Sequence, residues 1–184
     1  VLVALGSPKQ EEFILNNKLP NKEIIAILPG SRESEIRENL NIMHEISDDF
    51  AEYQFVIAGM SRFSEAHYKQ FLTKKNIHIV MDQTYNLIRN SKAAIVVSGT
   101  ATLETALLEC PEILVFKTHK LTWAIGRLFV NLKYLGLPNL IMEREVIPEL
   151  LQQNLTSANI KHELEKILFD TDYNNDFKNN YKLL

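Results

Sequence analysis

The chain lacks the features that mark several classes of protein. Its 184 residues include one cysteine, Cys110, which excludes an internal disulfide and, at a predicted helix end, favours a buried, inert thiol. No apolar run reaches the roughly 18–20 residues that a membrane-spanning helix needs. The five histidines show no metal-ligand spacing. Ser98 stands outside any G-x-S-x-G elbow, so the sequence gives no support to nucleophilic hydrolysis.

What the chain does contain is an alternation of short apolar runs and amphipathic segments. The runs predict strands at Glu23–Leu28, Tyr53–Ala58, Ile77–Val80, Ala93–Val97 and Glu112–Phe116. The segments between and after them predict helices at Glu33–Phe50, Ser64–Lys74, Gln83–Asn90, Ala101–Glu109, Ala158–Phe169 and Tyr173–Leu184. This order predicts an α/β fold with a Rossmann-like parallel sheet flanked by helices. Ligands of such sheets bind at the carboxyl ends of the strands.

The most informative stretch follows the fourth predicted strand. Ser98, Gly99 and Thr100 form a small polar turn that lets the backbone approach a ligand closely. The helix that begins near Ala101 would point its free N–H groups at that ligand, which suits a phosphate. Glu104, about one turn into the helix, could accept hydrogen bonds from a sugar diol. The alternative is a turn whose hydroxyl groups only cap the helix.

A second turn of the same kind follows the first predicted strand. Gly30 permits a tight turn after Pro29, and Ser31 is a good helix N-cap. Arg32 carries a planar, permanently charged guanidinium that suits phosphate. The alternative for Arg32 is a surface arginine paired with Glu35 or Glu38. Two such turns at one edge of a sheet predict a nucleotide site.

Three motifs in this order resemble those of the lipid-A-disaccharide synthases. They are Leu28-Pro29-Gly30-Ser31-Arg32 with Glu35, Ser98 to Glu104, and Leu137-Pro138-Asn139-Leu140 followed by Arg144-Glu145-Val146 and Pro148-Glu149-Leu150-Leu151. The resemblance covers roughly residues 1–170. It implies transfer of a 2,3-diacylglucosamine unit from UDP to 2,3-diacylglucosamine 1-phosphate, which forms lipid A disaccharide and releases UDP. It also implies a peripheral enzyme, cytoplasmic or at the inner membrane of a Gram-negative bacterium.

The resemblance further implies which half of a two-domain enzyme this is. Such enzymes have the glycosyltransferase-B architecture, and these motifs belong to the C-terminal, donor-binding half. We therefore expect residues 1–184 to form one nucleotide-sugar-binding domain, with 1–8 as the interdomain crossover and 155–184 as C-terminal helices. The N-terminal acceptor half, which we expect to hold the catalytic base, would be absent. Ser7 and Glu143 depart from the family pattern, which usually has His and Gly there.

Site residues follow from the motifs. We expect the diphosphate at the two turns, with positive charge from Arg32, and the donor oriented by Asn139, so that these two residues serve catalysis. The remaining expected binding residues are Gly30, Ser31, Ser98, Gly99, Thr100, Ala101, Thr102, Glu104, Arg144 and Glu145. We identify no metal-binding Asp-x-Asp sequence, so we expect neither metal nor other cofactor.

Charge is unevenly distributed along the chain. Residues 113–142 contain no Asp or Glu, and their charged residues are Lys117, Lys120, Arg127 and Lys133. Apolar and aromatic residues at helical spacing within 117–136 predict an amphipathic helix on an anionic membrane surface, or a core helix with a solvated basic face. The pI is near 6.0 and the sequence has no recognisable nucleic-acid-binding motif, which argues against binding to nucleic acid. Homo-oligomerisation stays open.

Two other functions remain open at this point. A UDP-sugar epimerase shares the architecture and the donor pocket. A nucleotide-binding or scaffolding module would use the same turns without any chemistry.

Overall fold

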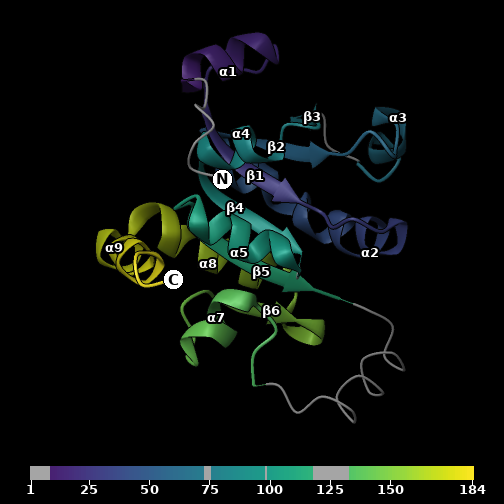
Figure 1. Cartoon of the computed structure of the whole chain (residues 1–184). Coiled ribbons are helices and arrows are strands. Elements are labelled where there is room, and N and C mark those ends of the chain that lie inside the picture. Colours follow the sequence, from purple (N-terminus) through teal and green to yellow (C-terminus); the bar gives the residue numbers. More distant parts are fainter. Residues whose placement is uncertain (1–8, 73–75, 98, 118–132) are drawn as a thin grey trace.

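The computed structural model describes residues 9–72, 76–97, 99–117 and 133–184 (Figure 1). Six parallel strands form one sheet in the order β3-β2-β1-β4-β5-β6. The strands are β1 (Glu23–Leu28), β2 (Tyr53–Gly59), β3 (Ile77–Met81), β4 (Ser91–Val97), β5 (Glu112–Phe116) and β6 (Glu149–Leu151). This is the doubly wound order: β2 and β3 are added on one side of β1, and β4, β5 and β6 on the other, so the strand order reverses between β1 and β4.

Helices follow the strands in alternation. They are α1 (Gln10–Asn16), α2 (Glu33–Met43), α3 (Glu65–Lys69), α4 (Thr84–Arg89), α5 (Thr100–Leu107), α7 (Leu137–Met142), α8 (Ser157–Phe169) and α9 (Thr171–Tyr181). Two 3₁₀ turns, η1 (Glu45–Phe50) and η2 (Gln152–Asn154), complete the described elements. The expected α/β class with a Rossmann-like parallel sheet is confirmed.

The core lies on both faces of the sheet. Alternate residues of β1 face opposite sides, since Ile25 and Ile27 join one buried cluster while Ile24 and Ala26 join another. The first cluster gathers apolar residues of α2, η1, α8 and α9, and the second those of α1 and α4. Strands buried on both faces read as continuous apolar runs, which is why the sequence located them well.

The sequence was less accurate for the helices. The expected helix Glu33–Phe50 ends at Met43 and continues as the 3₁₀ turn η1, and α3 is shorter than Ser64–Lys74. Four elements were not predicted: α1, α7, β6 and the 3₁₀ turn η2. Each spans three to seven residues, too few for a periodic pattern to emerge.

Several expectations fall on residues outside the described ranges. These are the crossover at 1–8, Ser98, and most of the basic stretch at 117–136. The assignment of residues 1–184 to a donor-binding half is likewise still a prediction. Among the described residues, no helix is both long and apolar enough to cross a membrane.

Candidate functional site

A cavity of about 660 Å³ opens at the carboxyl edge of the sheet. Leu28 at the end of β1 and Val97 at the end of β4 line its floor, so it lies where the strand order reverses. Parallel sheets of this order bind ligands at that point. Both predicted turns contribute to its wall, through Gly30, Ser31, Arg32, Gly99, Thr100 and Ala101. The structure therefore brings the two turns to one cavity.

The turn before α5 presents open backbone to this cavity. Gly99 has φ +149°, a conformation that favours glycine, and a Cβ built there would meet no atom within 4 Å. Thr100 and Ala101 open the helix beside it, and Glu104 lines the cavity one turn further along. A helix start beside such open backbone suits a phosphate.

Thr102 is directed into the protein interior and not into the cavity. Its side chain is fully buried, and its hydroxyl donates to the Gly99 carbonyl at 2.9 Å. It is not among the cavity-lining residues. The hydroxyl therefore stabilises the turn through its bond to the Gly99 carbonyl, and the geometry gives no support to the expected binding role of this side chain.

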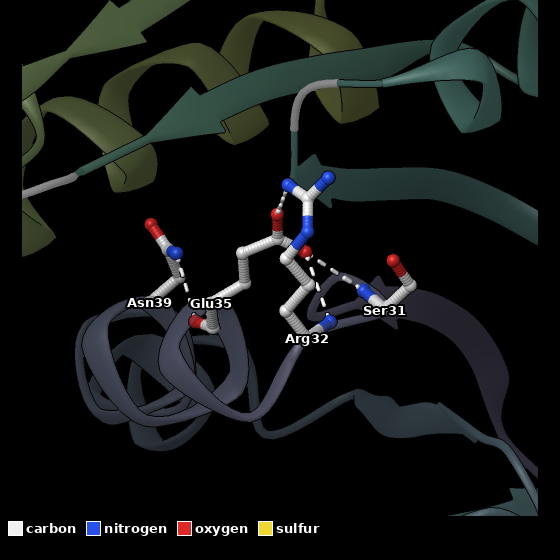
Figure 2. A network of polar contacts seen from close by, with 4 residues as sticks. All are labelled: Ser31, Arg32, Glu35 and Asn39. Atoms are coloured by element: carbon white, nitrogen blue, oxygen red, sulfur yellow. Dashed lines mark hydrogen bonds and ion pairs between the residues drawn. The ribbon is translucent and has the colours of Figure 1, made fainter.

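The turn before α2 is already occupied by a side chain (Figure 2). One carboxylate oxygen of Glu35 accepts hydrogen bonds from the backbone N–H groups of Ser31, at 2.9 Å, and Arg32, at 3.1 Å. The other oxygen pairs with the Arg32 guanidinium at 2.9 Å. Gly30 has φ +99°, and a Cβ there would lie 2.6 Å from the Glu35 carboxylate. Glu35 thus takes the place that we expected for a phosphate at this turn.

Arg32 itself remains available at the cavity wall. Its side chain is 77% exposed, and the pairing with Glu35 is the surface ion pair that the sequence left open as an alternative. Because the guanidinium is exposed to solvent, its attraction to the 14% exposed Glu35 carboxylate is weakened by screening. The guanidinium can therefore add a phosphate contact while Glu35 holds the turn.

Asn39, which the sequence did not single out, ties α2 to the sheet. It is fully buried, donates to the Glu35 carbonyl at 2.8 Å and accepts from the backbone N–H of Lys117 at 3.0 Å. The second contact links α2 to the residue that follows β5. Asn39 therefore holds α2, the helix that carries Glu35, against the chain that leaves β5.

A wall of the cavity that sequence reasoning missed comes from the β3–α4 connection. It consists of Asp82, Gln83, Thr84, Tyr85, Asn86 and Arg89. The Tyr85 hydroxyl hydrogen-bonds with the Glu104 carboxylate, and partial desolvation, then the Glu104 charge, raise the pKa of Tyr85. The signal was available, because a loop after a parallel strand reaches the same edge as the two glycine turns.

Asn139 does not reach the cavity. Its side chain is fully buried and makes four hydrogen bonds: it accepts from the N–H groups of Val146 and Ile147 and donates to the Ile147 carbonyl and Glu149. An asparagine amide has no further capacity once two donors and two acceptor positions are used. In this structure Asn139 joins α7 to the chain before β6, and the geometry gives no support to the expected contact with the donor.

Glu149 completes this junction from β6. Its carboxylate accepts from the backbone N–H groups of Leu135 and Gly136 as well as from Asn139. Two parts of the third motif, around Asn139 and Glu149, are therefore bonded to each other. Their spacing in the sequence reflects this contact.

Arg144 and Glu145 also stand apart from the cavity-lining residues. The Arg144 guanidinium donates to the Asn180 side chain on α9 at 2.6 Å. Glu145 lies close enough to α9 to contribute to the raised pKa of Tyr173, after burial and Glu163. The structure therefore directs both residues toward α9, and their expected role at the donor finds no support in its geometry.

Two titratable groups at the opposite edge of the sheet, Glu112 and Cys110, are buried. Glu112 at the start of β5 is fully buried, neither of its carboxylate oxygens has a hydrogen-bond partner, and burial raises its pKa well above the ordinary value. Burial and the neighbouring Glu112 likewise raise the pKa of Cys110, so the thiol is protonated and inert as expected.

The described residues hold no group of three or more His, Cys, Asp or Glu arranged for a metal ion. One Asp-x-Asp run does occur, at Asp170-Thr171-Asp172. Asp170 caps α9 by accepting from the N–H groups of Asp172 and Tyr173, both at 3.0 Å.

A family model described as lipid-A-disaccharide synthetase matches residues 5–182. The chain belongs to the lipid-A-disaccharide synthetase family. The lipid-A-disaccharide synthase of Sulfurihydrogenibium sp. is 32% identical over 180 residues, which are 89% of this chain and 46% of that protein. The Persephonella marina enzyme is 37% identical over 76% of this chain and 40% of its own length.

Members of this family thus extend well beyond the matched region, since the chain spans less than half the length of these curated relatives. Solved structures agree on the fold. The chain resembles the Escherichia coli ADP-heptose heptosyltransferase II with TM-score 0.64 and 15% identity, covering 91% of this chain and 53% of that one. A UDP-GlcNAc 2-epimerase from Neisseria meningitidis gives TM-score 0.51 and 16% identity, covering 95% and 42%.

Proposed function

We propose that this chain binds the donor of a glycosyltransferase of lipid A synthesis, a UDP-linked 2,3-diacylglucosamine. The observation that carries the proposal is the cavity at the β1–β4 reversal, which receives both glycine turns and Glu104. Membership of the lipid-A-disaccharide synthetase family supplies the chemical class. A cavity of about 660 Å³ is large enough for a nucleoside diphosphate.

In this proposal the diphosphate lies at the start of α5. The backbone N–H groups of Thr100 and Ala101 and the open backbone of Gly99 would hold its oxygens, and the exposed guanidinium of Arg32 would reach them from the opposite turn. The N–H groups of Ser31 and Arg32 stay with Glu35. The Glu104 carboxylate would accept hydrogen bonds from the ribose hydroxyls.

The proposed reaction is glycosyl transfer. The hydroxyl of 2,3-diacylglucosamine 1-phosphate would attack the anomeric carbon of the donor, a new C–O bond would form, and the bond to UDP would break with its electron pair leaving on the diphosphate. The residues of this chain would stabilise the charge that develops on that leaving group. We assign the base that takes the acceptor proton to the other half of the enzyme, so this chain alone would bind UDP and transfer little or no sugar.

The test is UDP binding measured by isothermal titration calorimetry on the 184-residue chain. Glu104→Ala should weaken binding by about tenfold, because a hydrogen bond to a charged group is lost. Glu165→Ala, an exposed carboxylate on α8, is the matched control and should bind as the unsubstituted chain does. Absence of UDP binding by the unsubstituted chain would overturn the proposal, and equal affinity of the Glu104 variant would remove the ribose contact from it.

A UDP-sugar epimerase is the second candidate, favoured by the structural similarity to a UDP-GlcNAc 2-epimerase. Product analysis of the full-length enzyme with UDP-N-acetylglucosamine separates the two, since only an epimerase converts this donor without an acceptor. A module with no chemistry that binds no nucleotide would fail the UDP titration.

A further inference from the structure

Tyr85 enters the cavity from a different element than the motif residues do. It is the second residue of α4, just after the β3–α4 connection, whereas Glu104 lies on α5. Both side chains line the same cavity. Tyr85 is 39% exposed, and it lies close enough to Glu104 for the charge of that carboxylate and a side-chain hydrogen bond to contribute to the raised pKa of Tyr85.

The chemistry of this contact has a fixed direction. An ionised carboxylate only accepts hydrogen bonds, so the phenol is the donor. Burial and the charge of Glu104 raise the pKa of Tyr85, which keeps its proton on the oxygen at neutral pH. The carboxylate has acceptor positions to spare after one phenol is bound.

Holding Glu104 in advance would matter for binding. A free glutamate side chain loses rotamer freedom when it engages a ligand, at a cost of roughly 1 kcal/mol or more. A tyrosine that restrains the carboxylate before the ligand arrives removes part of that cost. It also presents the remaining lone pairs in one orientation.

We propose that Tyr85 is a positioning residue of the donor site, which orients the Glu104 carboxylate toward the ribose hydroxyls of a bound uridine nucleotide. The inference rests on the proposed function, and it adds α4 to the elements that select the ligand. Tyr85 acts through Glu104 and need not touch the nucleotide.

The experiment compares two ligands, UDP and 2′,3′-dideoxy-UDP, by calorimetry on the 184-residue chain. Tyr85→Phe removes one hydroxyl and retains the ring, so packing is preserved. We expect it to weaken UDP binding by about three- to tenfold, the scale of one charge-assisted hydrogen bond, and to leave the dideoxy ligand within about twofold. The ratio of the affinities for UDP and the dideoxy ligand would not change if Tyr85 had only a structural role.

The matched control is Tyr173→Phe. Tyr173 donates to Glu163 at 3.0 Å between α9 and α8, the same pairing away from the cavity-lining residues. It should leave the affinities for both ligands unchanged. Equal losses for UDP and the dideoxy ligand in Tyr85→Phe, or no loss for either, would overturn the inference while UDP binding by the unsubstituted chain still supports the proposed function.

Discussion

Truncation of Asn139 to alanine is the sharpest test of how the third motif works. The sequence assigned Asn139 to the donor, whereas the structure buries it completely and uses all four of its hydrogen-bonding positions, at 2.7–2.9 Å. Asn139→Ala removes these partners together. The variant therefore separates a ligand contact from a structural junction.

The expected magnitude follows from the groups left behind. The N–H groups of Val146 and Ile147, both residues at most 7% exposed, lose their acceptor, and the Ile147 carbonyl and Glu149 lose a donor. A buried polar group without a partner costs about 1–3 kcal/mol. Allowing for water that enters the space, we expect the free energy of unfolding to fall by about 3–5 kcal/mol. For a chain of this size that lowers Tm by roughly 10 °C.

Urea unfolding followed by far-UV circular dichroism measures this loss. Asn159→Ala is the control, because its exposed amide donates a single hydrogen bond, to the Asn154 carbonyl, and should cost less than about 1 kcal/mol. Asn139→Asp keeps the acceptor oxygen but sets a second carboxylate against Glu149, so it should be unstable at neutral pH and recover in acid.

The reasoning would be refuted by an Asn139→Ala chain that unfolds at the same urea concentration as the unsubstituted one. If that variant lost UDP binding while keeping its stability, Asn139 would be a donor residue as the motif suggested. The hydrogen-bonded junction would then be incidental to the role of this side chain.

Two further predictions concern opposite ends of the sheet. Gly99→Ala places a methyl group in open cavity space at φ +149°, a backbone conformation that alanine rarely adopts, so it should lower the free energy of unfolding by about 1 kcal/mol. The methyl group should also weaken UDP binding about tenfold in calorimetry. Unchanged affinity would argue against contact between UDP and the Gly99 backbone. Burial raises the pKa of Glu112, so the native state keeps a proton that the unfolded chain releases above its ordinary value of 4.5. The free energy of unfolding should therefore fall as pH rises from that value, by up to about 1.4 kcal/mol per pH unit. Denaturant titrations at several pH values should show a smaller dependence on pH for Glu112→Gln. An equal pH dependence in the two chains would contradict the prediction.

The sequence located the sheet and the cavity because both follow from local patterns. Strands such as β1 are continuous apolar runs, and right-handed crossovers place every strand's following turn at one edge. That Gly30 and Gly99 line one cavity could therefore be predicted without any knowledge of side-chain contacts.

Side-chain direction was not available from the same patterns. A motif cannot tell whether a polar residue faces a ligand or the interior, which is why Asn139 was assigned to the donor and Asn39 was not noticed. Glu35 matched the family motif, but its bond to the N–H groups of its own helix start depends on tertiary geometry. Tyr85 lies on a short helix with no periodic signal, so only the folded chain reveals its contact with Glu104.

The sheet keeps its cavity-lining groups and its buried carboxyl at opposite ends. Glu112 opens β5, and the five residues of that strand span about 16 Å before its carboxyl end is reached. This separation could be used in protein engineering. An apolar replacement of Glu112 should stabilise the chain at neutral pH and leave the cavity lining unchanged, which would suit a protein used to screen for ligands of the cavity.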